Sequence, residues 1–478
     1  MVFPVVGGDG KPTGYEISNS VRYNDDDSPQ LSRSMSSGNQ QIFTLSTWLK
    51  RANISNGNQR IFSSDDEASA DFRLRFIAAD TLEFTDSYTG SSSTYTEVYT
   101  KRKFRDVSAW YHIVLAVDTT QGTASNRVKI YINGVEETDL DNGSGGSTKY
   151  PSQNDNLGFG RNGKTLEVGA SLYSSSPRQS VDMYLAETYA VDGAQLTPNY
   201  FGEFNDNNVW IPVKPGTGAG GSITYGTNGF LLEYKQTGTS QNSSGIGADT
   251  SGNDNHFAVT NLAATDVTTD TPTNNFCILN ALHKSTSDVV LSEGNLKMVS
   301  GYASGWQHAA GTMAVKNGKW YWEAKALSVA ATDKTSIGVL QFDTTDVDFV
   351  NVTNTDRSSK GISGHGAGTG SYTYAQGDII MCGMDLDNNK VYWGKNGTWF
   401  GNLDPAAGSG STTQTIDNSN FCVPAVGGYG GSSWEMNFGV PQFSISSGNA
   451  DADGYGNFEY APPSGFYALC TKNLAEYG

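Results

Sequence analysis

The sequence has no long apolar run and few basic residues, and each shortage excludes a class of protein. No apolar stretch approaches the ~20 residues that a membrane-spanning helix needs, so insertion into a membrane is not expected. Lys and Arg number 31 against 49 Asp and Glu, which gives a formal net charge of −18. A surface of this sign repels phosphate backbones, which disfavours direct binding to nucleic acid. The N-terminal MVFPVVGGDGKPTG has neither a basic leader nor an apolar core, so no secretory signal is expected.

The cysteines are also few, and their spacing argues against a disulfide framework and a zinc site. None forms a CxxC pair, and each lies among apolar or aromatic neighbours, in NFCIL, IMCGM, NFCVP and ALCTK. We therefore expect buried free thiols on strands at Cys277, Cys382, Cys422 and Cys470. Such thiols are typical of a chain that is assembled in a reducing cytoplasm.

The sequence is rich in the pattern of short β-strands and tight turns. Asn-Gly separates strand-like runs in VKIYINGVEE (128–137), MAVKNGKWYWEA (313–324) and KVYWGKNGTWF (390–400). This dipeptide favours the positive φ angles of a type I′ hairpin. Amphipathic helices are nearly absent, and the best candidate is LTPNYFGEF (196–204), with Thr197 as a cap. The prediction is an all-β chain of two antiparallel, jelly-roll-type β-sandwich domains in tandem, with very little helix.

Composition divides the chain into four parts. Residues 1–15 form a Gly- and Pro-containing N-terminal arm, and residues 16–205 form a first strand-rich unit. Residues 206–272 are polar and rich in Gly, Ser and Thr, which predicts a linker with short strands. Residues 273–478 form a second strand-rich unit.

The first unit resembles laminin-G-like, concanavalin-A-like domains. FTLSTWLKR (43–51) is similar to their early core strand, and AWYHIVLAVD with VKIYINGVEE is similar to their paired central strands. VDMYLAETYAVDGAQLTPNYFGEF (181–204) is similar to their closing strand and short helix. Alternation along these runs predicts the core-facing positions Leu45, Trp48, Ile113, Leu115, Val117, Ile130 and Ile132.

The second unit resembles a SPRY domain in three stretches that follow the family's order. They are GKWYWEAK (318–325), QGDIIMCGMDLDNNKVYWGKNGTWFGN (376–402) and CVPAVGGYGGSSWEMNFG (422–439). We expect burial of the strand tryptophans Trp322, Trp393 and Trp434. The ending EYAPPSGFYALCTKNL (459–474) is similar to that of phage-encoded SPRY proteins, and the tandem order is similar to that of phage structural and tail-fibre-type proteins.

Catalytic motifs are absent, and the one carboxylate pattern that resembles a glycosidase is weak. Glu137, Asp139 and Asp141 alternate along one strand, and retaining cleavage needs two carboxyl groups about 5–5.5 Å apart. These residues follow a hairpin and run into DNGSGGS, which indicates an exposed strand end. The prediction is that the chain is not an enzyme and requires no cofactor.

Two acidic turns are candidates for Ca²⁺, which takes six to eight oxygen ligands. They carry Asp25, Asp26 and Asp27 in YNDDDS, and Asp65 and Asp66 in SSDDEAS. The resemblance to laminin-G-like domains implies such a site. An Asp-rich turn is more often simply a solvated turn, so both interpretations stay open.

Aromatic residues in loops of the second unit are the candidates for ligand contact. By the resemblance to SPRY domains, which generally use loops at the sandwich edge, these are Tyr302, Trp306, His308, Tyr374 and Tyr429. Their rings can stack on sugar faces while the polar groups form hydrogen bonds at the rim. The alternative is that these rings only cap the sandwich.

The resemblance implies a virion protein of a phage, assembled in the host cytoplasm and exposed outside the cell on the particle. A fibre, spike or receptor-binding component would present its loops to host-surface glycan or protein. The alternatives are a purely structural capsid-decoration or tail-adaptor protein and, with less support, a glycan-cleaving enzyme. The expected partners are other virion proteins and further copies of the chain, with a trimer favoured because linked sites raise avidity.

Overall fold

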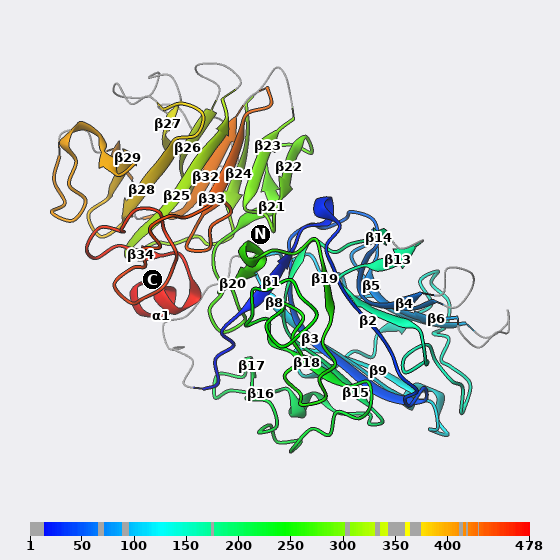
Figure 1. The fold of residues 1–478 in the computed structure, drawn as a ribbon. Helices are drawn as coiled ribbons and strands as arrows, with labels where there is room; N and C mark the ends of the chain where they lie inside the picture. Colours follow the sequence, from blue (N-terminus) through cyan, green and yellow to red (C-terminus); the bar gives the residue numbers. More distant parts are fainter. Residues whose placement is uncertain are drawn as a thin grey trace. The chain divides into compact units, whose positions relative to one another are not determined.

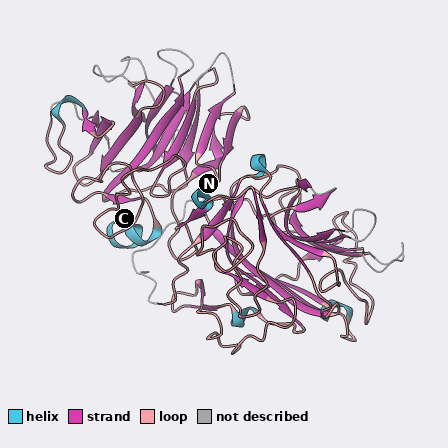
Figure 2. Cartoon of the chain, in the orientation of Figure 1, coloured by secondary structure: helices cyan, strands magenta, loops and turns pink. Residues whose placement is uncertain are grey.

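The computed structural model describes residues 14–65, 71–87, 95–173, 176–301, 306–329, 335–342, 359–363, 374–410, 414–416, 419–428 and 430–478. The chain divides between Thr273 and Asn274 into two compact units, here called the first and the second unit (Figure 1). Figure 2 shows that strands and loops make up nearly all of the chain. The predicted all-β class is confirmed, since the described residues include one α-helix, α1 (Thr471–Tyr477).

The first unit contains two large antiparallel sheets of eight strands each. In spatial order, sheet A consists of β10 (Val135–Glu136), β9 (Val128–Ile132), β8 (Trp110–Asp118), β3 (Ile42–Arg51), β15 (Met183–Asp192), β1 (Ser20–Tyr23) and β20 (Val267–Thr268), with β18 (Phe230–Leu232) paired to β15. Sheet B consists of β11 (Leu140–Asp141), β7 (Thr96–Thr100), β6 (Leu82–Asp86), β5 (Asp71–Phe76), β4 (Gln59–Asp65), β12 (Thr165–Val168), β2 (Gln30–Ser34) and β19 (Ala258–Thr260). Two small hairpins accompany them, β13 (Ser171–Tyr173) with β14 (Ser176–Arg178) and β16 (Gly202–Phe204) with β17 (Trp210–Pro212).

The main core of this unit lies between the inner faces of sheets A and B. Alternate residues of each strand enter it, as the period of two in a strand requires. Phe43 of sheet A, for example, meets Phe72 of sheet B with ring centroids 5.7 Å apart. Six of the seven predicted core positions belong to this cluster: Leu45, Ile113, Leu115, Val117, Ile130 and Ile132.

The seventh predicted position, Trp48, is buried on the opposite face of sheet A. Its neighbour Leu49 belongs to the main core, so the alternation of a strand turns Trp48 outward. It pairs with His112 of β8, and the two rings stack with centroids 4.7 Å apart. The prediction that Trp48 faces the space between the two sheets is therefore wrong, although its side chain is only 3% exposed.

His112 lies between two tryptophans and holds them together. Trp210 of β17 stacks on its other side at 5.9 Å, and the Trp210 indole N–H donates to Nδ1 of His112 (3.0 Å). Because Nδ1 accepts this bond, Nε2 carries the proton and donates to Oγ of Ser46 (2.8 Å). Complete burial lowers the pKa of His112 to about 3, so the ring is neutral at physiological pH.

The segment predicted as a linker, residues 206–272, is instead part of the first unit. β18 pairs with β15, β19 with β2 and β20 with β1. Phe230, Leu232, Tyr234, Ile246, Phe257 and Leu262 belong to the main core. A smaller cluster covers the outer face of sheet A and consists of Val114, Ala116, Tyr131, Tyr189, Phe201 and Leu231. The polar composition of residues 206–272 had suggested a solvated connector. The apolar residues spaced along this segment instead help to bury the outer face of sheet A.

The local turn signals have mixed outcomes. Asn133 and Gly134 have φ angles of 49° and 80°, and Asn396 and Gly397 have 48° and 85°, as type I′ hairpins require. Gly134 also has no room for a side chain, since a Cβ there would lie 2.3 Å from the Trp210 ring. The helix predicted over 196–204 is reduced to the 3₁₀ turn η3 (Pro198–Tyr200), followed directly by β16.

The second unit contains a five-stranded and a nine-stranded sheet. Sheet C consists of β21 (Leu279–Lys284), β24 (Gln307–Gly311), β32 (Phe421–Gly428), β26 (Thr335–Phe342) and β27 (Ser359–Ser363). Sheet D consists of β22 (Val289–Ser292), β23 (Lys297–Ser300), β33 (Ser433–Asn437), β25 (Lys319–Ser328), β28 (Ile379–Asp385), β29 (Lys390–Lys395) and β30 (Thr398–Trp399), with β31 (Gln414–Thr415) paired to β29 and β34 (Tyr467–Ala468) to β25. The other 3₁₀ turns are η1 (Asp25–Asp27), η2 (Ala124–Asn126), η4 (Ala264–Asp266) and η5 (Phe400–Asn402).

The predicted core of the second unit is confirmed. Trp322, Trp393 and Trp434 are fully buried, and the first two rings meet edge to face at 6.5 Å. The four cysteines are buried and free, as expected. Cys382 and Cys422 lie on strands, whereas Cys277 and Cys470 lie just outside them.

Replacing Trp210 by Ala tests whether the former linker is integral to the first unit. The change removes a ring that stacks on His112 and leaves Nδ1 of His112 without its donor, so the free energy of unfolding should fall by about 3–5 kcal/mol. Val209→Ala is the matched control, since Val209 is 54% exposed and should change stability little. Chemical denaturation of the full chain measures both variants, and equal midpoints would show that the segment is not part of the fold.

Candidate ligand-binding surface

Strand ends from both sheets of the second unit meet at one end of the sandwich. The pairing registers bring three strand ends together within each sheet, because two strands pair with the same terminal residue of a third, and Trp434 links the two sheets there. The pairs are Gln307 and Thr335 with Gly428 in sheet C, and Val299 and Ser328 with Ser433 in sheet D. Connections far apart in sequence therefore leave neighbouring strand ends, and we call this region the loop end.

The base of the loop end is held by Trp434. Its indole N–H donates to the carbonyl of Gly427 (2.9 Å), which links β33 of sheet D to β32 of sheet C. Tyr374 packs against the same indole, with ring centroids 5.4 Å apart. The carbonyl of Asp378 accepts from the amide of Ala326, so the segment before β28 is tied to β25. The loops thus leave from a packed base rather than from frayed strand ends.

In this base Gln307 is hydrogen-bonded inside the protein, and the two histidines are uncharged. Gln307 accepts from Ser300 Oγ (2.9 Å) and donates to Thr286 Oγ1 (2.7 Å). His308 is 2% exposed, and burial together with nearby His283 lowers its pKa to about 4. Both histidines are therefore neutral at physiological pH, since burial also lowers the pKa of His283 to about 4.

The five predicted contact residues differ in burial and in whether the structure describes them. Tyr302 and Tyr429 lie outside the described residues, and Trp306, directly before β24, is half-buried. His308 and Tyr374 are buried, so their prediction as surface contacts is wrong. β24 begins at Gln307, which places His308 inside a strand, and Tyr374 caps the sandwich through Trp434. The small residues Ala309 and Ala310 after His308 were the sequence signal for a buried strand.

The alternating carboxylates of the first unit each have a separate partner. Glu137 pairs with Arg102 (3.0 Å) and Asp139 with Lys101 (2.7 Å). Asp141 accepts from the amide of Gly143 (2.7 Å). Glu137 and Asp139 are thus engaged in ion pairs, and Asp141 stabilises a turn.

The predicted acidic turns do not gather into a cation site in the part of the chain that is described. Asp25, Asp26 and Asp27 form η1, where Asn24 donates to Asp27 Oδ2 (2.9 Å). No group of three or more His, Cys, Asp or Glu side chains in the described ranges has an arrangement that could hold a metal. The side chain of Asp65 and all of Asp66 lie outside these ranges, so Ca²⁺ there stays a prediction.

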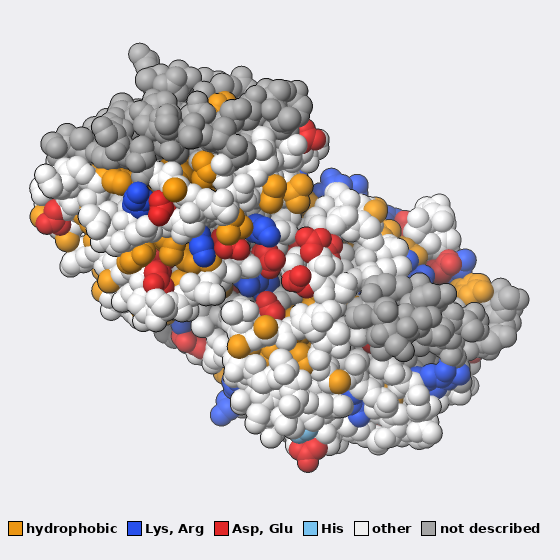
Figure 3. Space-filling view, turned by 45° about the horizontal axis from the view of Figure 1, so that its top comes forward, with side chains coloured by type: hydrophobic (Ala, Val, Ile, Leu, Met, Phe, Trp, Pro, Cys, Tyr) orange, Lys and Arg blue, Asp and Glu red, His pale blue; other side chains and the backbone are white. Residues whose placement is uncertain are grey.

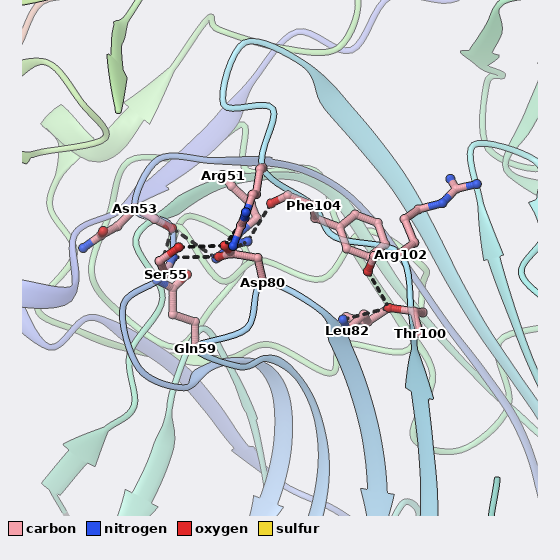
Figure 4. Close-up of polar contacts among 10 residues, drawn as sticks. Arg51, Asn53, Ser55, Gln59, Asp80, Leu82, Thr100, Arg102 and Phe104 are labelled. Atoms are coloured by element: carbon pink, nitrogen blue, oxygen red, sulfur yellow. Dashed lines mark hydrogen bonds and ion pairs between the residues drawn. The ribbon is translucent and has the colours of Figure 1, made fainter. Parts of the chain in front are cut away.

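Asp80 is a buried carboxylate whose oxygens accept hydrogen bonds from protein groups (Figure 4). Oδ1 accepts from the Ser55 amide (2.6 Å) and Arg51 (3.1 Å), and Oδ2 accepts from Ser55 Oγ (2.8 Å) and Arg105 (2.7 Å). Burial alone would raise the pKa of Asp80, but these donors outweigh it and hold the pKa below its usual value. Arg51 also donates to the carbonyl of Phe104 (2.7 Å), so the cluster fastens three connections together.

Two buried glutamates serve as internal anchors. Glu323 of β25 accepts from Tyr321 (2.9 Å), Asn437 (3.1 Å) and the amides of residues 459 (2.9 Å) and 460 (2.7 Å). Glu187, at a register shift in β15, accepts from Tyr189 (2.9 Å) and from the hydroxyl of Tyr15. Burial raises the pKa of each to about 7, against the lowering effect of these donors. Neither side chain can reach a ligand, because both are almost completely buried.

Basic side chains do not form a continuous area on the face shown in Figure 3. Lys and Arg lie there singly or in small groups among acidic and uncharged residues. Within the described residues, no helix is long and apolar enough to cross a membrane.

Comparison with known protein families gives a match within the first unit. Residues 24–170 match the family model described as the Concanavalin A-like lectin/glucanases superfamily. The first unit therefore contains a laminin-G-like, concanavalin-A-like domain. A search of curated proteins gives no match.

Solved structures similar to the chain include SPRY domains and lectin-like proteins. The SPRY domain of human HERC1 is 17% identical, with 33% of this chain and 96% of that chain covered and a TM-score of 0.25. A heptameric SAP-like pentraxin from Limulus polyphemus is 15% identical, with 38% and 80% covered and a TM-score of 0.27. A putative carbohydrate binding protein from Bacteroides ovatus is 14% identical, with 52% and 58% covered and a TM-score of 0.32.

Replacing Asp80 by Ala should destabilise the first unit strongly. The change leaves the buried Arg51 guanidinium without its counter-charge, and breaking a buried ion pair on one side costs about 3–5 kcal/mol. Asp139→Ala is the control, because its pair with Lys101 is solvent-exposed and contributes little to stability. Urea denaturation compares the two, and similar losses would contradict the anchoring role of Asp80.

Replacing Glu187 by Gln should change how stability depends on pH. The folded pKa of about 7 exceeds the ordinary 4.5, so the wild-type contribution is fully present below about pH 4.5 and is lost as pH rises to about 7. The Gln variant has no group to ionise, so its stability relative to wild type should rise between about pH 4.5 and pH 7. Above about pH 7 the difference between the two proteins should stay constant. Denaturation midpoints at several pH values test this, and parallel curves would show that Glu187 ionises normally.

Proposed function

We propose that the chain is a non-enzymatic component of a phage virion and that the loop end of the second unit is its recognition surface. The observation that carries this proposal is the convergence of connections from both sheets on the packed base around Trp434. A rigid base with variable loops is the usual way in which a sandwich presents a binding surface.

The state of the buried polar groups favours binding over catalysis. Glu187 and Glu323 are enclosed and fully engaged, and His112, His283 and His308 are neutral and buried. General acid–base catalysis needs such a group within hydrogen-bond reach of a substrate. None of these five side chains is in that position.

The proposal of a virion rests on the sequence resemblances, namely the tandem order and the phage-like ending at 459–474. In this setting the partners are other virion proteins and a glycan or protein of the host surface. Several copies, with a trimer favoured, would raise avidity by roughly 10²–10⁴ without new contacts. The net charge of −18 argues against an acidic polysaccharide as ligand unless a cation bridges the two.

A purely structural role, as a decoration or adaptor protein, has one specific observation in its favour. Tyr374 and His308 are used inside the sandwich, which leaves Trp306 as the candidate aromatic with partial exposure among the described residues. In that role the loops would contact neighbouring virion subunits rather than the host.

Adsorption of particles that carry Trp306→Ala distinguishes the two roles. Stacking of an aromatic ring on a ligand contributes about 0.5–1.5 kcal/mol beyond area burial, so receptor binding predicts clearly slower adsorption to host cells. Phe421→Ala is the matched control, since Phe421 is 47% exposed and lies at the opposite end of β32. Normal adsorption of correctly assembled Trp306→Ala particles would favour the structural role.

A further inference from the structure

Four side chains form a row on the outer face of sheet A. The register pairs Lys50 of β3 with Trp110 of β8 on one side and with Tyr184 of β15 on the other, and Tyr184 pairs in turn with Arg22 of β1. The neighbouring residues Leu49 and Leu185 point into the main core, so this row faces away from it. Lys50 is 0% exposed, although it is a lysine in the middle of a sheet.

Asp270, near the C-terminal end of the first unit, covers this row. Its Oδ2 forms an ion pair with Nζ of Lys50, and its Oδ1 accepts from the Trp110 indole (3.3 Å). Its own backbone is fixed at both ends, since its amide donates to Thr268 Oγ1 (3.1 Å) and its carbonyl accepts from Ser20 Oγ (2.6 Å). The carboxyl group is 1% exposed and has a defined position against the amine.

The surroundings of the pair are aromatic and closed to water. Nζ of Lys50 lies 4.8 Å from the centroid of the Tyr184 ring and 5.9 Å from that of Trp110. In such a medium the separated charges lose their hydration, which favours proton transfer to a neutral amine and a neutral acid. The two groups are then held in contact at an effective concentration of the order of 10⁵–10⁸ M.

We propose that Lys50 and Asp270 condense to an amide, so that the first unit carries an internal covalent cross-link. A proton passes from the Lys50 ammonium to the Asp270 carboxylate, and the amine lone pair attacks Cγ of Asp270 to form the C–N bond. The C–OH bond then breaks and one molecule of water leaves. The reaction consumes no oxidant, reductant or co-reactant.

Asp182 is the group placed to relay the proton in this step. It directly precedes β15, two residues before Tyr184, which pairs with Lys50, and it is 0% exposed. Its carboxylate takes the proton from the attacking nitrogen and returns it to the departing hydroxyl, and so ends unchanged. Exclusion of bulk water removes the reagent for the reverse hydrolysis.

The two residues of the pair are 220 positions apart in the sequence. The amide would join the C-terminal end of β3 to the segment just before the division at Thr273. It would therefore lock the covering segment onto sheet A in a way that unfolding cannot release.

Mass spectrometry of the purified full chain tests the proposal. The intact mass should be lower than the sequence mass by one water molecule, and a protease digest should contain one branched peptide that joins Lys50 to Asp270. The Lys50→Arg variant keeps the positive charge but cannot form this amide, so it should show the full mass. Asp182→Asn should leave most chains uncondensed, and complete condensation in that variant would remove Asp182 from the reaction.

Lys319 and Asp385 of the second unit provide an internal control in the same digest. They also form an ion pair (3.1 Å), but Lys319 is 27% exposed, so these two residues should be recovered in separate peptides. Recovery of Lys50 and Asp270 in separate peptides from folded wild-type protein, at the full sequence mass, overturns the proposal and leaves a buried ion pair. This outcome needs no variant to fold.

Discussion

The burial of both faces of sheet A is the constraint on which the first unit depends. A sandwich normally leaves one face of each sheet to water, but every residue of β3 from Phe43 to Arg51 is buried here. Each polar side chain on the outer face must therefore find a partner inside the protein. Ser46 meets His112, Glu187 meets two tyrosines, and Lys50 meets Asp270. His112 and Tyr189 belong to sheet A itself, whereas Tyr15 and Asp270 come from segments outside the sheet. The sheet and the segments that cover it are therefore stable only together.

Local sequence signals predicted those parts of the fold that depend on neighbouring residues. The all-β class, the buried tryptophans of the second unit and two of the three Asn-Gly hairpins follow from turn geometry and alternation, and the structure confirms them. The third hairpin, at Asn317-Gly318, is not formed, since Asn317 lacks a positive φ and no strand precedes it. The segment that covers the outer face of sheet A, residues 206–272, could not be predicted from such local signals. On β3, Ser46 and Lys50 follow the pattern of the polar face of a half-exposed strand. The residues that cover this face, Trp210 and Asp270, lie in a stretch whose composition is that of a linker. Only the tertiary fold brings these residues together.

The candidate surface shows the same division between local and non-local information. Resemblance to SPRY domains directed attention to loops at one end, and the strand registers do bring connections together there. The resemblance did not distinguish residues in the loops from residues in the base of the loop end. The beginning of β24 at Gln307 turns His308 into a strand residue, and a single ring contact with Trp434 makes Tyr374 part of the core. A shift of one or two residues in a strand boundary decides between these roles, and sequence patterns do not resolve boundaries that finely.

The pairing of β1 with β20 has a consequence for synthesis on the ribosome. Ser20 pairs with Thr268, so the first and last strands of the first unit lie side by side. While the chain is emerging, sheet A can assemble from β1, β3, β8, β9 and β15 by the time residue 192 is available, but its outer face then has no cover. Lys50 and Trp110 remain accessible to other nascent chains until the following eighty or so residues, which include Asp270, have been added. The unit thus combines a high contact order with a late closing step, which makes chaperone binding during synthesis most valuable in this interval.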